Sequence, residues 1–293
     1  MNRIPATVVT GFLGAGKTSL IRHLMENANG RRIALIINEF GDLGVDRGIV
    51  DGCAIPGCED EDIVELANGC ICCTVADDFL PTITALLDRE NPPEHIVIET
   101  SGLALPKPLV KAFAWPEVRA RTTVDGVVTV IDAAAVIAGR FADDPEAIEA
   151  ARAEDPSLDH DNPLEELFVD QVSCADLIVI NKADLLTGDG SDIEAALAPH
   201  RRSGVKSVRT SHGQLDPAVL LGLDAGAEDD LDSRPSVHDG EAEHDHDDFD
   251  SFIRGKALWH EEVANLKDST LQKLRSTVFR MLVEAGLLSG DRR

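Results

Sequence analysis

This sequence of 293 residues has no apolar run of the roughly 18 residues that a membrane-spanning helix needs. Its first residues, MNRIPATVVTGF, lack a signal-peptide pattern, because their apolar stretch leads directly into a glycine loop. We therefore expect a cytoplasmic protein with no membrane partner. Positive charge is also scarce, with 27 basic against 53 acidic side chains and a net charge of −26. Because such a surface repels phosphate backbones, we expect no nucleic-acid partner and a preference for cations.

Cysteine is present but not in a pattern typical of secreted proteins. Without an export signal, we expect the thiols to stay reduced. We therefore expect these cysteines to take part in metal binding or redox chemistry and not in a disulfide network. The six residues are Cys53, Cys58, Cys70, Cys72, Cys73 and Cys174.

Short apolar runs alternate with segments of helical spacing along the chain. Several runs lack polar alternation, as expected of strands that helices cover on both faces. This alternation predicts an α/β fold with a mostly parallel, doubly wound sheet, in which ligands bind at the carboxyl ends of strands. The predicted strands are Thr7–Thr10, Ile33–Ile37, His95–Ile98, Val127–Ile131, Leu177–Ile180 and Val205–Val208.

A glycine-rich loop after the first predicted strand matches the phosphate-binding pattern G-x-x-x-x-G-K-[ST]. Its glycines allow backbone N–H groups to point at phosphate oxygens, and the following helix N-terminus adds partial positive charge. Lys17 is expected to reach the β- and γ-phosphates, and the Thr18 hydroxyl to bind Mg²⁺. The candidate phosphate-binding residues are Gly11, Gly14, Ala15, Gly16, Lys17, Thr18 and Ser19.

The sequence Asn181-Lys182-Ala-Asp184 follows the predicted strand Leu177–Ile180. A carboxylate at Asp184 can accept hydrogen bonds from N1–H and the 2-amino group of guanine, a pair that adenine does not offer. Asn181 and Lys182 are expected to brace the loop and to cover the base. Together with the glycine-rich loop, this motif favours GTP over ATP as the ligand.

Two further polar motifs follow predicted strands. Glu99 begins E-T-S-G, where an acid can hold a metal-bound water and the Gly102 N–H can sense a γ-phosphate. Glu39 and Asp42 belong to N-E-F-G-D and could ligate a metal or position the attacking water, although a helix N-cap role suits Asp42 equally. We name Lys17, Glu99 and Glu39 as candidate catalytic residues.

Three thiols in a C-x-C-C arrangement, Cys70, Cys72 and Cys73, form a candidate site for a transition metal. Soft thiolates bind zinc or copper(I), and cobalt(II) adopts the same tetrahedral sites. Burial as small hydrophobic residues is the alternative for these cysteines. For Cys174, alone before an apolar strand, core packing is the expected role.

Five motifs in this order, GFLGAGKT, NEFGD, GCICC, ETSG and NKAD, cover about residues 5–222 and resemble the CobW family of metal-handling GTPases. The resemblance implies that GTP and Mg²⁺ organise a metal site from the C-x-C-C thiols, and that hydrolysis releases the metal to a protein client. The segment DLGVDRGIVDGCAIPGC is similar to the cobalamin-biosynthesis branch of the family. That branch implies cobalt(II) as cargo and a cobalt chelatase as client, with zinc as the alternative cargo.

Composition divides the chain into a P-loop GTPase domain over 1–222, an acidic, His-rich linker over 223–248 and a helical tail over 249–293. The tail carries 8 basic and 6 acidic residues and departs from the family, whose members usually continue with a sheet-containing domain. His238, His244 and His246 could collect metal, or the linker could be a solvated acidic segment.

Two other functions fit the same motifs. A metal store, in which nucleotide stabilises only the fold, predicts metal affinity that is indifferent to GTP. A redox-responsive GTPase predicts that mild oxidation removes two titratable thiols. A metal switch, in which GTP organises the C-x-C-C metal site and hydrolysis releases the metal, predicts instead that GTP and metal each raise the affinity for the other.

Overall fold

The computed structural model describes residues 3–37, 63–65, 79–141, 164–187 and 189–236. By its contacts the chain divides into a unit of residues 1–239 and a unit of residues 240–293. Every described residue belongs to the first unit, so the predicted tail over 249–293 lies outside the described residues.

The described residues form a seven-stranded sheet in the order β3-β2-β4-β1-β5-β6-β7, with every neighbouring pair parallel. The chain moves to one side of β1 for β2 to β4 and to the other side for β5 to β7, so the strand order reverses beside β1. Ligands of such sheets bind at this reversal, outside the carboxyl ends of the strands. The strands are β1 (Ile4–Thr10), β2 (Ile33–Ile37), β3 (Ile63–Glu65), β4 (His95–Glu99), β5 (Thr122–Asp132), β6 (Leu177–Asn181) and β7 (Lys206–Arg209). The predicted parallel α/β fold is confirmed, and each predicted strand overlaps an observed one.

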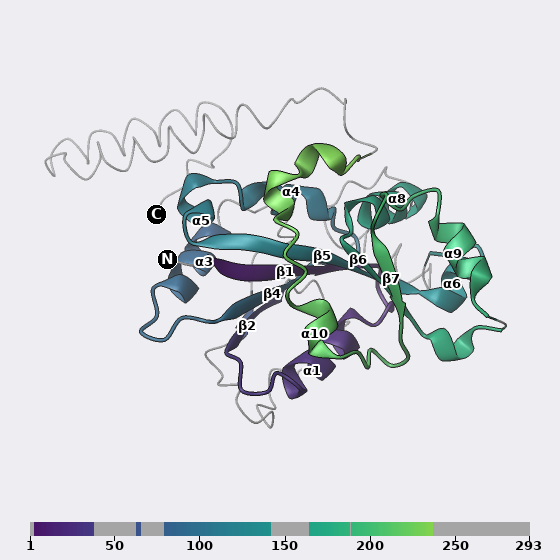
Figure 1. Cartoon of the computed structure of the whole chain (residues 1–293), viewed down its shortest axis with the longest axis horizontal. Coiled ribbons are helices and arrows are strands. Elements are labelled where there is room, and N and C mark those ends of the chain that lie inside the picture. The colour runs from purple at the N-terminus through teal and green to yellow at the C-terminus, as the bar shows by residue number, and fades with distance from the viewer. Residues whose placement is uncertain (1–2, 38–62, 66–78, 142–163, 188, 237–293) are drawn as a thin grey trace, which may run out of the picture. The chain divides into compact units, whose positions relative to one another are not determined.

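Helices cover both faces of the sheet (Figure 1). Side chains of β2 show the division, because Ala34 and Ile36 face one core while Leu35 and Ile37 face the other. This two-sided burial explains why the strands lack polar alternation. One face carries α1 (Lys17–Glu26) and α10 (Pro217–Leu220), and the other carries α3 (Leu80–Leu87), α4 (Pro106–Ala112), α5 (Pro116–Arg119) and α8 (Leu164–Cys174). Shorter elements are α6 (Ala133–Ile137), α9 (Ser191–Leu197), η3 (Ala183–Leu185), η4 (Ala227–Asp229) and η5 (Leu231–Ser233).

β5 begins five residues before the predicted strand, and a bulge explains the difference. Its pairing with β1 shifts from Ala6↔Val124 to Thr7↔Gly126, so Asp125 is the extra residue. Asp-Gly usually indicates a turn, but a glycine inside a strand also marks a bulge or a close approach. A Cβ on Gly126 would lie 2.5 Å from Leu223 Cδ1, so the glycine makes room for the segment after α10.

The first part of the predicted linker, residues 223–236, packs against this domain. The Asp125 carboxylate accepts hydrogen bonds from the backbone N–H groups of residues 222–224 at 2.7–3.2 Å. Glu228 accepts from Thr123 Oγ1 at 2.6 Å, and Arg234, with 1% of its side chain exposed, pairs with Asp176 at 2.7 Å. Residues 223–236 therefore pack against the domain instead of forming the predicted linker from 223, and Glu228, one of the acidic residues that suggested a solvated segment, is a hydrogen-bond acceptor. Residues 237–248 lie outside the described residues.

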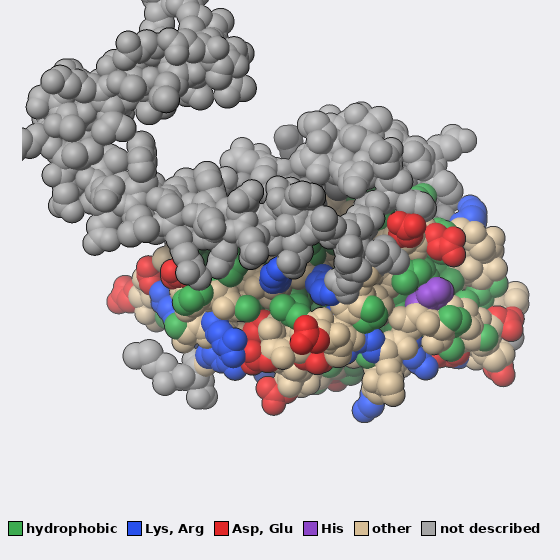
Figure 2. Space-filling model, turned by 90° about the horizontal axis from the view of Figure 1, so that it is seen from above, with side chains coloured by type: hydrophobic (Ala, Val, Ile, Leu, Met, Phe, Trp, Pro, Cys, Tyr) green, Lys and Arg blue, Asp and Glu red, His purple; other side chains and the backbone are tan. Residues whose placement is uncertain are grey.

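Among the described residues, no helix is long and apolar enough to cross a membrane. Figure 2 shows acidic and basic side chains interspersed on the visible part of one face. The negative net charge is therefore not gathered into a single patch there.

Candidate nucleotide-binding site

The glycine-rich loop connects the carboxyl end of β1 to α1, and its backbone conformation requires glycine. Gly11 and Gly16 have φ values of 135° and 99°, which L side chains rarely adopt. A Cβ on Gly11 would lie 2.1 Å from Val130 O, and one on Gly16 would lie 2.2 Å from Asn181 Nδ2. The loop therefore fits tightly between β5 and the residue that ends β6.

Lys17 opens α1, and its ammonium group lies inside the loop. Nζ donates to Gly11 O at 2.8 Å and to Phe12 O at 3.3 Å, with 7% of the residue exposed. Burial lowers the pKa of Lys17, although the negative charge of Glu99 acts in the opposite direction. The loop thus holds a buried positive charge beside the carbonyl groups of its own backbone.

Thr18 and Glu99 meet at the same end of the sheet. Thr18 Oγ1 donates to Glu99 Oε1 at 3.4 Å. Glu99 is the last residue of β4, where its backbone is in register with Val9 of β1 and Ile37 of β2. Burial raises the pKa of the Glu99 carboxyl, while Lys17 and the Thr18 hydroxyl lower it. A hydroxyl and a carboxylate are hard oxygen ligands, so this pair fits Mg²⁺.

The E-T-S-G loop lies against the glycine-rich loop. A Cβ on Gly102 would be 2.6 Å from Leu13 N, so only glycine permits this approach. Gln171 of α8 holds the loop from the other side, with Nε2 donating to Gly102 O at 3.1 Å and to Ala104 O at 3.3 Å. The Gly102 peptide is thereby fixed beside the phosphate-binding loop.

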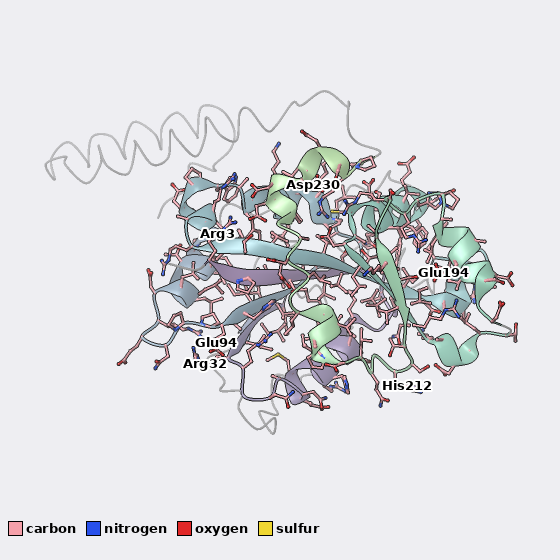
Figure 3. All side chains as sticks on the ribbon, in the orientation of Figure 1. Arg3, Arg32, Glu94, Glu194, His212 and Asp230 are labelled. Atoms are coloured by element: carbon pink, nitrogen blue, oxygen red, sulfur yellow. The ribbon has the colours of Figure 1, made fainter. Side chains whose placement is uncertain are left out.

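Asn181 joins the glycine-rich loop to the loop that follows β7. Its Nδ2 donates to Ala15 O at 2.9 Å, and its Oδ1 accepts from Gly213 N at 3.1 Å. Gly213 has a φ of 68°, and a Cβ there would lie 2.6 Å from Leu20 N of α1. Figure 3 marks His212 in this loop; Arg32 and Glu94 mark the opposite end of the sheet, just before β2 and β4. The Asn181 side chain therefore connects the glycine-rich loop to the loop after β7.

Lys182 and Asp184 extend the site from the end of β6. Lys182 has a left-handed backbone, with φ 57° and ψ 33°, and its Nζ pairs with Asp132 Oδ2 at 2.6 Å. Asp184 is exposed, and its backbone N–H donates to Ser211 Oγ at 3.2 Å. An exposed carboxylate here is accessible to a ligand beside the glycine-rich loop.

Several candidates cannot be placed. Glu39 and the thiols of Cys70, Cys72 and Cys73 lie outside the described residues, as do Asp42, Cys53 and Cys58. Cys174 is described and buried in the core, as predicted, and burial raises its pKa to about 11. In the part of the chain that the structure describes, no group of three or more His, Cys, Asp or Glu side chains could hold a metal ion.

Three contributors to the site were not predicted from the sequence. Asp132 ends β5, Gln171 lies on α8, and Gly213 follows β7. Asp132 comes directly after the predicted strand Val127–Ile131, so the rule that identified Glu99 and Asn181 would also have identified it. Gly213 lies five positions after the predicted strand Val205–Val208, outside the reach of that rule. Gln171 lies within a helix and carries no such signal.

Comparison with known proteins agrees with this geometry. Residues 5–204 match the family described as CobW/HypB/UreG, nucleotide-binding domain. The chain belongs to this family and carries its GTPase domain. The matched residues include the glycine-rich loop, Glu99 and the Asn181–Asp184 motif. Residues 234–293 match a second family, described as BrxA.

Relatives similar to this chain include two proteins named zinc chaperone CobW. The one from Sinorhizobium sp is 57% identical over 256 residues, which cover 86% of this chain and 72% of that protein. The one from Pseudomonas aeruginosa is 53% identical over 244 residues, covering 82% of this chain and 65% of that protein. A solved structure, the Zn(II)-bound YjiA GTPase from E. coli, is 25% identical with a TM-score of 0.48, covering 76% of this chain and 63% of that one. The chain thus spans about two thirds of the length of such relatives.

Proposed function

We propose that this protein is a metallochaperone that binds a transition-metal ion in its GTP-bound form and releases it to a protein client after hydrolysis. The observation that best supports nucleotide binding is that the Asn181 side chain joins the phosphate-binding loop to the loop after β7 through two hydrogen bonds. Because Ser211 of the loop after β7 also accepts from Asp184 N, phosphate and base recognition would share this connection at the carboxyl ends of the strands.

Each described residue has a role that follows from its position. The Lys17 ammonium would exchange the carbonyl oxygens of Gly11 and Phe12 for β- and γ-phosphate oxygens, which carry full charge. Asp184 would accept from N1–H and the 2-amino group of guanine. Lys182 would cover the base from the side of β6.

Thr18 and Glu99 would hold Mg²⁺, since their oxygens already face each other. Held by these two residues, Mg²⁺ would supply positive charge that offsets the negative charge developing during phosphoryl transfer. Glu99, and Glu39 of the N-E-F-G-D motif, are the candidates for orienting the attacking water. The Gly102 N–H would bind the γ-phosphate, while Gln171 holds the carbonyl of the same residue.

The metal half of the proposal rests on Cys70, Cys72 and Cys73, whose thiolates suit zinc and cobalt(II). The names of two relatives with over 50% identity support zinc as the cargo. Cobalt(II), with a cobalt chelatase as client, is the other cargo that the motifs suggest. GTP would order the loops on either side of the cysteines, as γ-phosphate contacts order switch segments in other GTPases.

A single-turnover release experiment tests this function. Protein loaded with GTP, Mg²⁺ and one equivalent of Zn²⁺ is mixed with a fluorescent zinc chelator while phosphate release is followed in parallel. The proposal predicts that zinc reaches the chelator at the rate of GTP hydrolysis and that Lys17→Ala abolishes both signals. The triple change of Cys70, Cys72 and Cys73 to Ser should remove the zinc signal alone, whereas the buried Cys174→Ala should retain it. Zinc release at the same rate without hydrolysis would contradict the proposal.

A further inference from the structure

The ion pair between Asp132 and Lys182 lies at the point where β5 and β6 end together. Asp132 is in register with Asn181 in the parallel β5–β6 pair, so Lys182 is the first residue beyond that pair. The Lys182 Nζ is 2.6 Å from Asp132 Oδ2, and the exposed fractions of the two side chains are 24% and 1%. The register of two strands therefore sets this contact.

The two carboxylate oxygens of Asp132 have different partners. Oδ1 accepts from Ala135 N at 3.0 Å and caps the N-terminus of α6. Oδ2 makes no hydrogen bond among the described residues, so its contact with the Lys182 ammonium is an ion pair, and this ion pair neutralises the carboxylate. A buried carboxylate without a positive partner is strongly destabilising, so the fold holds this lysine firmly.

Lys182 is constrained from its backbone as well. Its left-handed conformation is unusual for a residue with a side chain, and the next residue, Ala183, donates its N–H to Thr210 O at 3.0 Å. A free lysine side chain loses rotamer entropy when it is ordered. Because Asp132 already fixes Nζ, this entropy is lost on folding and does not weaken the binding of a ligand that contacts the lysine stem.

We propose that Asp132 is a positioning residue of the nucleotide site, which holds the Lys182 side chain in the conformation that covers the guanine base. This inference rests on the proposed function, since it requires a guanine nucleotide at the Asn181–Asp184 motif. Asp132 itself touches neither base nor phosphate. Asp132 affects the affinity for guanine nucleotides only by holding the Lys182 side chain in place.

Asp132→Asn is the test variant. Asn caps helices as well as Asp does, but it has one oxygen, so capping α6 leaves an amide NH₂ facing the lysine ammonium. We expect GTP and GDP to bind about tenfold more weakly, because the ion pair with Asp132 no longer holds the Lys182 side chain in place. The preference for GTP over ATP should not change, because Asp184 reads the edge of the base. Asp216→Asn makes the same chemical change at the N-cap of α10 and should leave affinity unchanged.

A double-mutant cycle separates positioning from a structural role. Lys182→Met keeps the apolar stem and removes the charge, so Asp132→Asn should change GTP affinity by less than about twofold in that background. A full tenfold loss in both backgrounds would overturn the inference. If Lys182→Met unfolds because the Asp132 carboxylate is left unpaired, the double variant is compared with Asp132→Asn alone, and equal affinities are expected.

The wild-type protein distinguishes failure of this inference from failure of the proposed function. Absence of guanine-nucleotide binding, measured with a fluorescent GDP analogue, would overturn the proposed function. Tight binding that Asp132→Asn leaves unchanged would overturn only the role of Asp132.

Discussion

Thr18 Oγ1 donates to Glu99 Oε1 across 3.4 Å, which brings together the first turn of α1 and the last residue of β4. The two residues are 81 positions apart in the sequence, yet the β1–β4 pairing places them at one point. Both oxygens are hard ligands beside the buried Lys17 ammonium. Nucleotide, Mg²⁺ and the candidate catalytic carboxylate therefore share a single location in this account.

Thr18→Ala should weaken GTP binding in the presence of Mg²⁺ by tenfold to roughly a hundredfold, because it removes an oxygen ligand from the cation. The measurement is a GTP titration at several Mg²⁺ concentrations. Thr18→Ser keeps the hydroxyl and is the matched control. Equal affinities of the Ala and Ser variants would show that the hydroxyl does not bind the cation.

Replacing Gly16 should cost more stability than replacing Gly14. Both have left-handed backbones, so an alanine at either position costs about 1–2 kcal/mol. A Cβ on Gly14 meets nothing within 4 Å, whereas one on Gly16 lies 2.2 Å from Asn181 Nδ2. Gly16→Ala must displace Asn181 and weaken two hydrogen bonds of about 1 kcal/mol each. Urea unfolding of the two variants gives the comparison, and equal losses would argue against the tight fit.

Asp184→Asn should change base preference from GTP toward xanthosine triphosphate. An amide can donate to the 2-oxo group of xanthine, while it loses one acceptor for the donors of guanine. We expect GTP affinity to fall about a hundredfold and the affinity for xanthosine triphosphate to rise. Competition against a fluorescent nucleotide measures both, with the exposed Asp192→Asn of α9 as a charge control. Unchanged preference would show that Asp184 does not read the base.

His95 should make the fold sensitive to acid. Its ring is 2% exposed, with Nε2 at 2.8 Å from Thr7 Oγ1, and burial lowers the pKa of His95 from 6.5 to about 4, against the attraction of Asp125. The unfolded chain therefore takes up this proton first. The free energy of unfolding therefore keeps the full contribution of neutral His95 above pH 6.5. As pH falls toward 4, it decreases by about 3 kcal/mol.

The free energy of unfolding, measured by urea titration between pH 7 and 4, tests the role of His95. His95→Gln lacks the titrating group, so its free energy of unfolding should fall less steeply with acid than that of the wild type. The same slope in both proteins would assign the acid sensitivity to other groups.

The parallel sheet and the phosphate-binding loop were predictable from the sequence, because apolar runs and glycine spacing are local signals. β3 and the first half of β5 were not. β3 has three residues, and the Asp125-Gly126 bulge looks like a turn until the pairing with β1 is known. Composition likewise suggested a linker at Glu228, which instead accepts hydrogen bonds from β5.

The site was predictable where one motif contains its chemistry. Asn181 and Lys17 could be found from spacing, and the structure brings both to the glycine-rich loop. The ion pair of Lys182 with Asp132 depends on the register of β5 and β6, and the hold of Gln171 on Gly102 depends on how α8 packs. Neither register nor packing is encoded in a short local pattern.

The most direct test of the metal switch is an anaerobic titration of cobalt(II) with Mg²⁺ and GTP, GDP or no nucleotide, followed by visible absorption. Cobalt(II) reports thiolate ligands in the tetrahedral sites that zinc also occupies. The account predicts tight binding with thiolate charge-transfer bands only in the GTP-bound protein, and loss of these bands in Cys72→Ser. Equal binding in all three nucleotide states would contradict the account and favour a metal store.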